Sequence, residues 1–123
     1  MKNIKKSICF DIDNVICKTV KSNYIKSKPI KKNIKFINNL YHQGHTIKIF
    51  TARYMGRTGD NATKAKKKAK KITLNQLKKW KVKFHKIYFG KPSSDFYIDD
   101  KNLNFKSNWI KHLKSSIKWK KTN

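Results

Sequence analysis

Four short runs of apolar, strand-favouring residues constrain the fold of this chain more than any other feature. They are KSICFDI (6–12), HTIKIFT (45–51), FHKIYF (84–89) and DFYID (95–99). Segments with a helical spacing of apolar residues separate the first three runs and follow the last. This alternation is typical of a parallel sheet wrapped by helices. We therefore predict an α/β fold, a Rossmann-like three-layer sandwich with sheet order 3-2-1-4.

Three segments carry the helical pattern. The first is predicted to begin at Pro29 and to end at Gly44. The second is predicted to begin at residue 72, where Thr73 and Gln76 form a capping box, and to run to about Lys81. The third covers residues 107–119. In this third helix, Ile110, Leu113 and Ile117 are predicted to face inward. In the first helix, the predicted inward residues are Ile30, Ile34, Ile37, Leu40 and Tyr41.

Two polar segments connect these elements. Residues 14–28 are predicted to form a loop or small flap. Residues 52–71 are predicted to form a long loop, within which KAKKKAK (64–70) is interpreted as a solvated helical extension rather than an anion-binding arm. The chain has no internal repeat and no linker, so residues 1–123 are predicted to form a single domain.

The charge of the chain is strongly one-sided. A formal net charge of +26 comes from 32 lysines and arginines against six aspartates and no glutamate. This excess predicts nonspecific binding of nucleic acid at low salt. An AT-rich genome also places lysine, asparagine and isoleucine on solvated surfaces, and we regard that composition bias as the larger contribution.

The compartment is predicted from the cysteines and the apolar runs. Cys9 and Cys17 lie in or near the first strand and are too few for a disulfide framework. The N-terminal segment imitates a signal peptide until Asp11 and Asp13 interrupt its apolar part. No run approaches the roughly 18 apolar residues of a membrane span. The sequence predicts a soluble cytoplasmic protein.

Polar side chains follow every predicted strand. Asp11 ends the first strand and Asp13 comes two residues later; Thr51 ends the second strand. Gly90-Lys91-Pro92 follows the third, and Asp99-Asp100 ends the fourth. Ligands of open parallel sheets bind beyond the carboxyl ends of the strands, so we expect these groups to meet. Four of the six aspartates of the chain lie at these strand ends, and Asp95 is near them in sequence.

This set of groups predicts phosphate chemistry. Crowded carboxylates require a counter-charge, and Mg²⁺ prefers oxygen ligands. Lys91 and the Thr51 hydroxyl add a positive charge and a hydrogen-bond donor. Asp11 is placed to attack phosphorus as a nucleophile, and Asp13 to protonate the leaving oxygen and then activate water.

Four motifs in order resemble those of the haloacid dehalogenase (HAD) superfamily, whose members are mostly phosphatases. They are FDIDNVI, IKIFTAR, GKP and FYIDD, within residues 7 to 105. The resemblance implies that Asp11 is the nucleophile, that Asp13 is the general acid/base, and that Thr51 and Lys91 hold the phosphoryl oxygens. It further implies a Mg²⁺ site made by Asp11, the Asp13 backbone carbonyl, Asp99 and Asp100.

The resemblance also narrows the substrate. TAR and FGKPSSDFYIDDKNLNF are similar to small, capless HAD proteins of bacterial capsule and surface-polysaccharide gene clusters, which implies a sugar phosphate. Residues 14–28 and 52–71 are the two places for a cap domain. Both are too polar to fold alone, so we expect a capless enzyme with 52–71 as at most a partial lid. An open site suits a large substrate, or a small one enclosed by a partner subunit in a homo-oligomer.

Three further residues are candidates for substrate binding. Asn14 stands where the family commonly has glycine, at a turn that glycine would relax. Arg53 and Arg57 are the only arginines among thirty lysines. The planar guanidinium fork binds carboxylate or phosphate through paired hydrogen bonds, which lysine cannot do. We therefore expect both arginines to bind a second anionic group of the substrate; Arg53 packing on the sheet edge is the alternative.

Two other functions remain open from the sequence. The first is a phosphatase acting on nucleic-acid ends, which would use the open site and the lysines together. The second is a basic nucleic-acid-binding module with a vestigial HAD site, which the complete set of aspartates disfavours.

Overall fold

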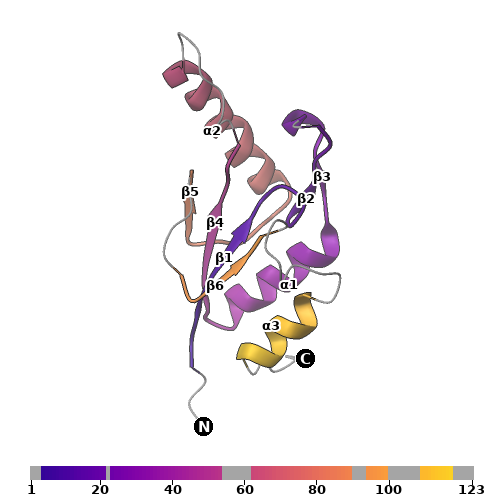
Figure 1. Ribbon diagram of the computed structural model, residues 1–123, viewed down its shortest axis with the longest axis vertical. Helices are drawn as coiled ribbons and strands as arrows, with labels where there is room; N and C mark the ends of the chain where they lie inside the picture. Colours follow the sequence, from indigo (N-terminus) through magenta and orange to yellow (C-terminus); the bar gives the residue numbers. More distant parts are fainter. Residues whose placement is uncertain (1–3, 22, 54–61, 90–93, 100–108, 118–123) are drawn as a thin grey trace.

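A parallel four-stranded sheet forms the centre of the protein (Figure 1). The computed structural model describes residues 4–21, 23–53, 62–89, 94–99 and 109–117. The sheet order is β5-β4-β1-β6. The strands are β1 (Ser7–Asp11), β4 (Thr46–Phe50), β5 (Lys86–Tyr88) and β6 (Phe96–Ile98), each inside one of the four predicted runs. The α/β architecture with a parallel sheet is therefore confirmed.

Strand β1 lies in the middle of the sheet, and its three central residues are fully buried. Its pairing with β4 sets Ile8 beside Ile47, and its pairing with β6 sets Ile8 beside Phe96. Side chains alternate between the two faces of a strand. Ile8, Phe10, Ile47 and Ile49 therefore share one face, and all four are fully buried.

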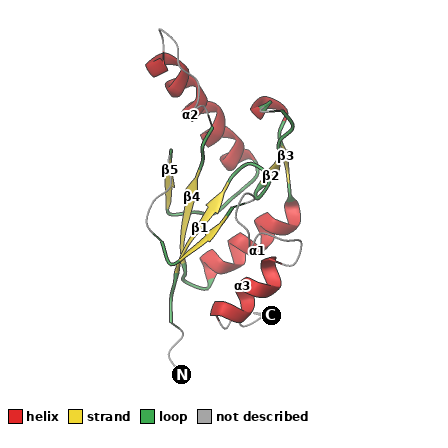
Figure 2. Cartoon of the chain, viewed as in Figure 1, coloured by secondary structure: helices red, strands yellow, loops and turns green. Residues whose placement is uncertain are grey.

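Three helices contribute to the hydrophobic cluster on that face (Figure 2). They are α1 (Lys31–His42), α2 (Ala62–Lys79) and α3 (Trp109–Ile117). Most of α2 extends beyond the carboxyl ends of the strands (Figure 2). Trp109 packs edge-on against Phe10 of β1 and Phe36 of α1, with ring centroids 6.2 and 5.9 Å apart. Each helix contributes to the same hydrophobic cluster, so the described residues form two layers. The third layer of the predicted sandwich is not seen among them.

The start of α1 differs from the prediction. Pro29 was expected at the first helical position, but it pairs with Cys17 in a short antiparallel ribbon and the helix begins at Lys31. The N–H of Ile30 donates to the carbonyl of Ile16, which holds the chain extended just before the helix. The predicted end is correct, since Gly44 follows α1 with a φ of 92°.

The segment between β1 and α1 was predicted to form either a loop or a small flap, and it folds into a flap. It consists of β2 (Cys17–Lys18), a 3-10 turn η1 (Tyr24–Lys26) and β3 (Lys28–Pro29), with β2 and β3 antiparallel. We refer to residues 17–21 and 23–29 as the flap. No strand was predicted here, because two-residue strands have no periodicity to detect.

Helix α2 is longer than predicted. It begins at Ala62 rather than residue 72, so the polar stretch 52–71, predicted as a long loop and at most a partial lid, is helical from Ala62 onward. The interpretation of 64–70 as a helical extension is confirmed, whereas the capping box at Thr73 and Gln76 is wrong because both lie inside the helix. Among the helices that the structure describes, none is long and apolar enough to cross a membrane.

One buried histidine at the amino end of the sheet predicts a pH-dependent stability. The Nδ1 atom of His45 accepts a hydrogen bond of 3.1 Å from the N–H of Lys6. Burial, and secondly the charge of Lys5, lower the pKa of His45 below its ordinary value of 6.5. The unfolded chain therefore binds more protons than the folded chain below about pH 6.5, and the contribution of neutral His45 to stability is lost as the pH falls through that range.

We expect the free energy of unfolding to fall between pH 7 and pH 5, and to fall less steeply in His45→Gln. Urea denaturation at several pH values measures both slopes. His42→Gln, which changes an exposed histidine at the end of α1, should keep the wild-type slope. Equal slopes in the wild type and His45→Gln would contradict the assignment.

Candidate functional site

The carboxyl edge of the sheet brings three predicted site residues together. Asp11 is the last residue of β1, and Asp99 directly follows β6. Because Phe10 pairs with Ile98, Asp11 and Asp99 come next on adjacent parallel strands. Thr51 directly follows Phe50, the partner of Asp11 on β4. Lys91, Asp100 and Arg57, which were also predicted for the site, lie outside the described residues.

The turn after β1 is tight and has a left-handed residue. The carbonyl of Ile12 accepts hydrogen bonds from the N–H groups of Val15, Ile16 and Cys17. Asn14 has a φ of 66°, a conformation that asparagine tolerates better than most residues. Its Oδ1 atom accepts a 3.3 Å hydrogen bond from the N–H of Thr19 in the flap. The side chain of Asn14 therefore supports the turn, and its predicted role in substrate binding stays a prediction.

Asp11 and Thr51 are held by neighbouring backbone groups. The Oδ1 atom of Asp11 accepts a 2.8 Å hydrogen bond from the N–H of Ile12, and the residue is half-buried. The hydroxyl oxygen of Thr51 accepts a 3.0 Å hydrogen bond from the N–H of Arg53. Thr51 is 1% exposed, and this hydrogen bond does not use its hydroxyl proton.

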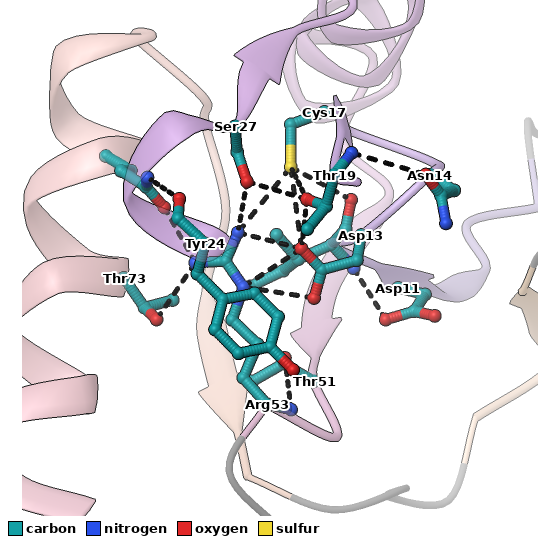
Figure 3. Close-up of polar contacts among 12 residues, drawn as sticks. Asp11, Asp13, Asn14, Cys17, Thr19, Tyr24, Ser27, Thr51, Arg53 and Thr73 are labelled. Carbon is teal, nitrogen blue, oxygen red and sulfur yellow. Dashed lines mark hydrogen bonds and ion pairs between the residues drawn. The ribbon is translucent and has the colours of Figure 1, made fainter. Parts of the chain in front are cut away.

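Asp13 forms a buried ion pair with Arg53 (Figure 3). The Nη2 atom of Arg53 donates to Oδ1 of Asp13 at 2.8 Å, and Nε donates to both carboxylate oxygens at 3.0 Å. The side chain of Arg53 is 0% exposed and that of Asp13 is 21% exposed. The pair therefore lies mostly out of water, with only the carboxylate reaching the surface.

The remaining contacts of Arg53 come from the flap and α2. Its Nη1 atom donates to Thr73 at 3.2 Å and to Gln76 at 2.7 Å. Its guanidinium lies 4.8 Å from the centre of the Tyr24 ring, in cation–π geometry. Gln76 in turn donates through Nε2 to the carbonyl of Tyr24 at 2.6 Å. One arginine thus joins the end of β4 to the flap and to α2.

The described contacts of Arg53 are made within the chain, and its predicted role in substrate binding stays a prediction. The guanidinium fork does bind a carboxylate, as its planar geometry favours, but the carboxylate is Asp13 of the same chain. The side chain of Arg53 has no exposed surface, and Asp13 already occupies its fork. The sequence pointed to Thr73 and Gln76 as a capping box. Their hydrogen bonds with Arg53 have no sequence signal, because Arg53 lies 20 and 23 residues before them.

Cys17 lies beside the ion pair. Burial raises the pKa of its thiol, a hydrogen bond with Thr19 opposes that rise, and the negative charge of Asp13 adds to it. The thiol is therefore neutral at pH 7 and is not a nucleophile. Both cysteines of the chain are buried and free of disulfides.

The donors that a divalent cation would need are oxygens at the carboxyl edge. Within the described ranges, no three side chains of His, Cys, Asp or Glu gather closely enough to form a metal site by themselves. Asp11 and Asp99 are adjacent there, while the carboxylate of Asp13 is engaged by Arg53. Two carboxylates and a backbone carbonyl fit the hard-oxygen preference of Mg²⁺. Asp95 does not contribute, because it accepts from the N–H of Ser7 at the amino end of β1.

Two solved structures share this architecture over almost the whole chain. A crystal structure of a structural-genomics target from Vibrio cholerae aligns with a TM-score of 0.64 and 26% identity, covering 90% of this chain and 98% of that one. A conserved protein from Bacteroides thetaiotaomicron aligns with a TM-score of 0.56 and 18% identity, covering 95% and 94%. No family model and no curated protein matches the sequence. The comparisons establish a shared fold.

Proposed function

We propose that this protein is a capless member of the HAD superfamily and hydrolyses phosphate monoesters with Mg²⁺. The observation that carries the proposal is the meeting of Asp11, Thr51 and Asp99 at one edge of a parallel sheet, with Asp13 two residues beyond Asp11. A chain with six acidic residues in all has two of them adjacent at this edge and a third in the next turn. The four sequence motifs supply the same residues in the same order.

The reaction proceeds in two steps on the residues of this chain. In the first, a carboxylate oxygen of Asp11 attacks phosphorus, the bond to the leaving oxygen breaks, and Asp13 transfers a proton to that oxygen. In the second, Asp13 takes a proton from water as the water oxygen attacks phosphorus, and the bond to Asp11 breaks. Phosphate leaves and both aspartates return to their starting states.

Thr51 and the metal site support both steps. The hydroxyl of Thr51 donates a hydrogen bond to a phosphoryl oxygen and keeps the phosphorus facing Asp11. Asp11, Asp99 and the backbone carbonyl of Asp13 would hold Mg²⁺. When bound, the ion neutralises the charge of the phosphoryl group and of the crowded carboxylates.

The substrate class follows from the sequence motifs. We propose a sugar phosphate, because TAR and the segment from Phe89 to Phe105 resemble the polysaccharide-cluster group. Turnover of a panel of sugar phosphates, nucleotides and phosphorylated oligonucleotide ends, with Mg²⁺ and with a chelator, tests the proposal. Magnesium-dependent release of phosphate from one class supports it, and no release from any class contradicts it.

A groove favours nucleic-acid binding as a second candidate function. It lies between α1 and the end of α2, has a volume of about 710 Å³ and contains the half-buried Trp80 in its wall. Four exposed lysines line it, together with His42, and its lining within the described part of the chain includes no aspartate. The lysines are Lys31, Lys35, Lys79 and Lys81. Cations around an aromatic ring suit a single strand, whose bases stack and whose phosphates need counter-charge.

We expect single-stranded DNA to bind at low salt and to dissociate steeply as salt rises. Changing the four groove lysines to glutamine should weaken binding at least about tenfold more than the same change at Lys67, Lys71, Lys86 and Lys111. Each set removes four positive charges, so a difference between them reports the position of the lysines and not the net charge. The control lysines are exposed and lie outside the groove. Fluorescence anisotropy across a salt series measures both sets. Equal losses would show that the binding is general counterion release, with no site in the groove.

A further inference from the structure

The two carboxylate oxygens of Asp13 have unequal surroundings. Oδ1 accepts hydrogen bonds from Nη2 and Nε of Arg53 and a third from the hydroxyl of Thr19, at 2.8, 3.0 and 2.6 Å. The thiol of Cys17 lies 3.8 Å from the same oxygen. Among the described residues, Oδ2 accepts only the shared Nε hydrogen bond, at 3.0 Å. Oδ1 is therefore saturated with donors, whereas Oδ2 keeps acceptor capacity.

We infer that Arg53 is a positioning residue, which anchors Oδ1 of Asp13 so that Oδ2 is the atom that exchanges the catalytic proton. This inference rests on the proposed phosphatase function and assigns a role within it. A carboxylate on a single Cβ rotates freely unless donors hold one oxygen. Three bonds from Arg53 and one from Thr19 fix that rotation and leave one oxygen for the leaving group or for water.

Arg53 is itself held rigidly, so that it can act as an anchor. Thr73 and Gln76 of α2 engage its Nη1 atom, and the Tyr24 ring covers its planar face. Gln76 closes the arrangement by donating to the carbonyl of Tyr24. With a side chain that is 0% exposed, Arg53 influences the reaction only through Asp13.

The proton balance assigns separate tasks to the two residues. In the first step the proton on Oδ2 passes to the leaving oxygen, and Asp13 becomes a carboxylate. In the second step Oδ2 takes a proton from the attacking water. Arg53 keeps all its protons throughout and stabilises the carboxylate form that exists between the steps.

The test compares two substrates whose leaving groups differ in their need for a proton. An alkyl phosphate requires protonation of its leaving oxygen, whereas p-nitrophenyl phosphate requires little. The value of kcat/KM reports the first chemical step for both. The variants are Asp13→Asn, Arg53→Met, the double variant and Arg53→Lys, with Asp11→Asn as the inactive reference.

We expect Arg53→Met to lose roughly 10- to 100-fold in kcat/KM on the alkyl phosphate and less than about threefold on p-nitrophenyl phosphate. The double variant should be no slower than Asp13→Asn alone, because Arg53 acts through Asp13. Arg53→Lys should restore little, since an ammonium group cannot hold two oxygens in a plane. Equal losses on both substrates, or multiplicative losses in the double variant, would overturn the inference while leaving the proposed function intact.

Thr19→Val supplies a second variant in case Arg53→Met fails to fold. It removes one donor to Oδ1 and should slow the alkyl phosphate alone, by roughly threefold to tenfold. Ser27→Ala is the matched control, because Ser27 contacts Thr19 and Arg53 but not Asp13. A Thr19→Val variant indistinguishable from Ser27→Ala would count against the anchor. If the unaltered protein is no faster than Asp11→Asn on either substrate, the proposed function fails and the positioning role fails with it.

Discussion

Asp11→Asn is expected to lower kcat by at least about a thousandfold without unfolding the protein. The amide keeps the shape of the carboxylate and still accepts the 2.8 Å hydrogen bond from the N–H of Ile12. It loses the negative charge that attacks phosphorus and that contributes to the metal site. Steady-state turnover of the best substrate, with circular dichroism and thermal melting of the same samples, measures both parts of the prediction.

Asp95→Asn is the matched control for this experiment. It makes the same chemical change at the opposite end of the sheet, where Asp95 accepts from the N–H of Ser7 at 2.7 Å. Its kcat should stay within about twofold of the wild type, since surface changes away from a site have small effects. Wild-type turnover by Asp11→Asn would rule out a covalent intermediate on this residue.

Asp13→Ala is expected to destabilise the fold by about 3 kcal/mol, at the low end for a broken buried ion pair because Asp13 keeps some exposure. The change leaves the guanidinium of Arg53 in a site with 0% exposure and removes its charged partner. The melting temperature should fall by roughly 10 °C or more. Chemical denaturation measures the free energy, and Asp95→Ala, with the same change in net charge, should cost at most about 1 kcal/mol.

The double variant Asp13→Ala/Arg53→Met distinguishes an unpaired charge from lost packing. Removing both partners together replaces the ion pair with apolar groups, which is often neutral or stabilising in proteins. We expect the double variant to be more stable than Asp13→Ala alone by at least about 1 kcal/mol. A double variant with additive losses would show that the two side chains contribute independently.

The sheet could be predicted because its information is local. Each strand is a short apolar run of β-branched and aromatic residues, and β1 shows burial on both faces within five residues. The polar residues at the strand ends meet because parallel strands share a carboxyl edge. The adjacency of Asp11 and Asp99 therefore follows from topology alone.

The environment of Arg53 could not be predicted, because its partners come from segments distant in sequence. Because arginine is rare in this lysine-rich chain, the sequence did indicate that Arg53 is needed for its planar guanidinium group. Proximity to Thr51 suggested an exposed loop facing a ligand. The Arg53 side chain is buried because the flap and α2 pack over it. Neither segment has a sequence pattern that predicts where it packs.

The start of α2 was missed because propensity and periodicity disagree there. The residues from Ala62 to Lys71 are mostly alanine and lysine, which favour helix but carry no apolar stripe. Thr73 and Gln76 have the spacing of a capping box, which made the first apolar residues look like a helix start. In the structure these two side chains accept hydrogen bonds from Arg53 instead. The same residue pair that often caps a helix here makes a tertiary contact.

The position of β1 in the sheet has a consequence for synthesis of the chain. Ser7 of β1 is hydrogen-bonded to Asp95 beside β6, 88 residues later, whereas Lys6 beside β1 is hydrogen-bonded to His45 beside β4, only 39 residues later. Strand β1 therefore leaves the ribosome long before its second neighbour, because 88 residues separate Ser7 from Asp95. Until then it has one unpaired, apolar edge, which other chains can add to. During synthesis, the central strand of this sheet is therefore the one that most needs protection from pairing with other chains.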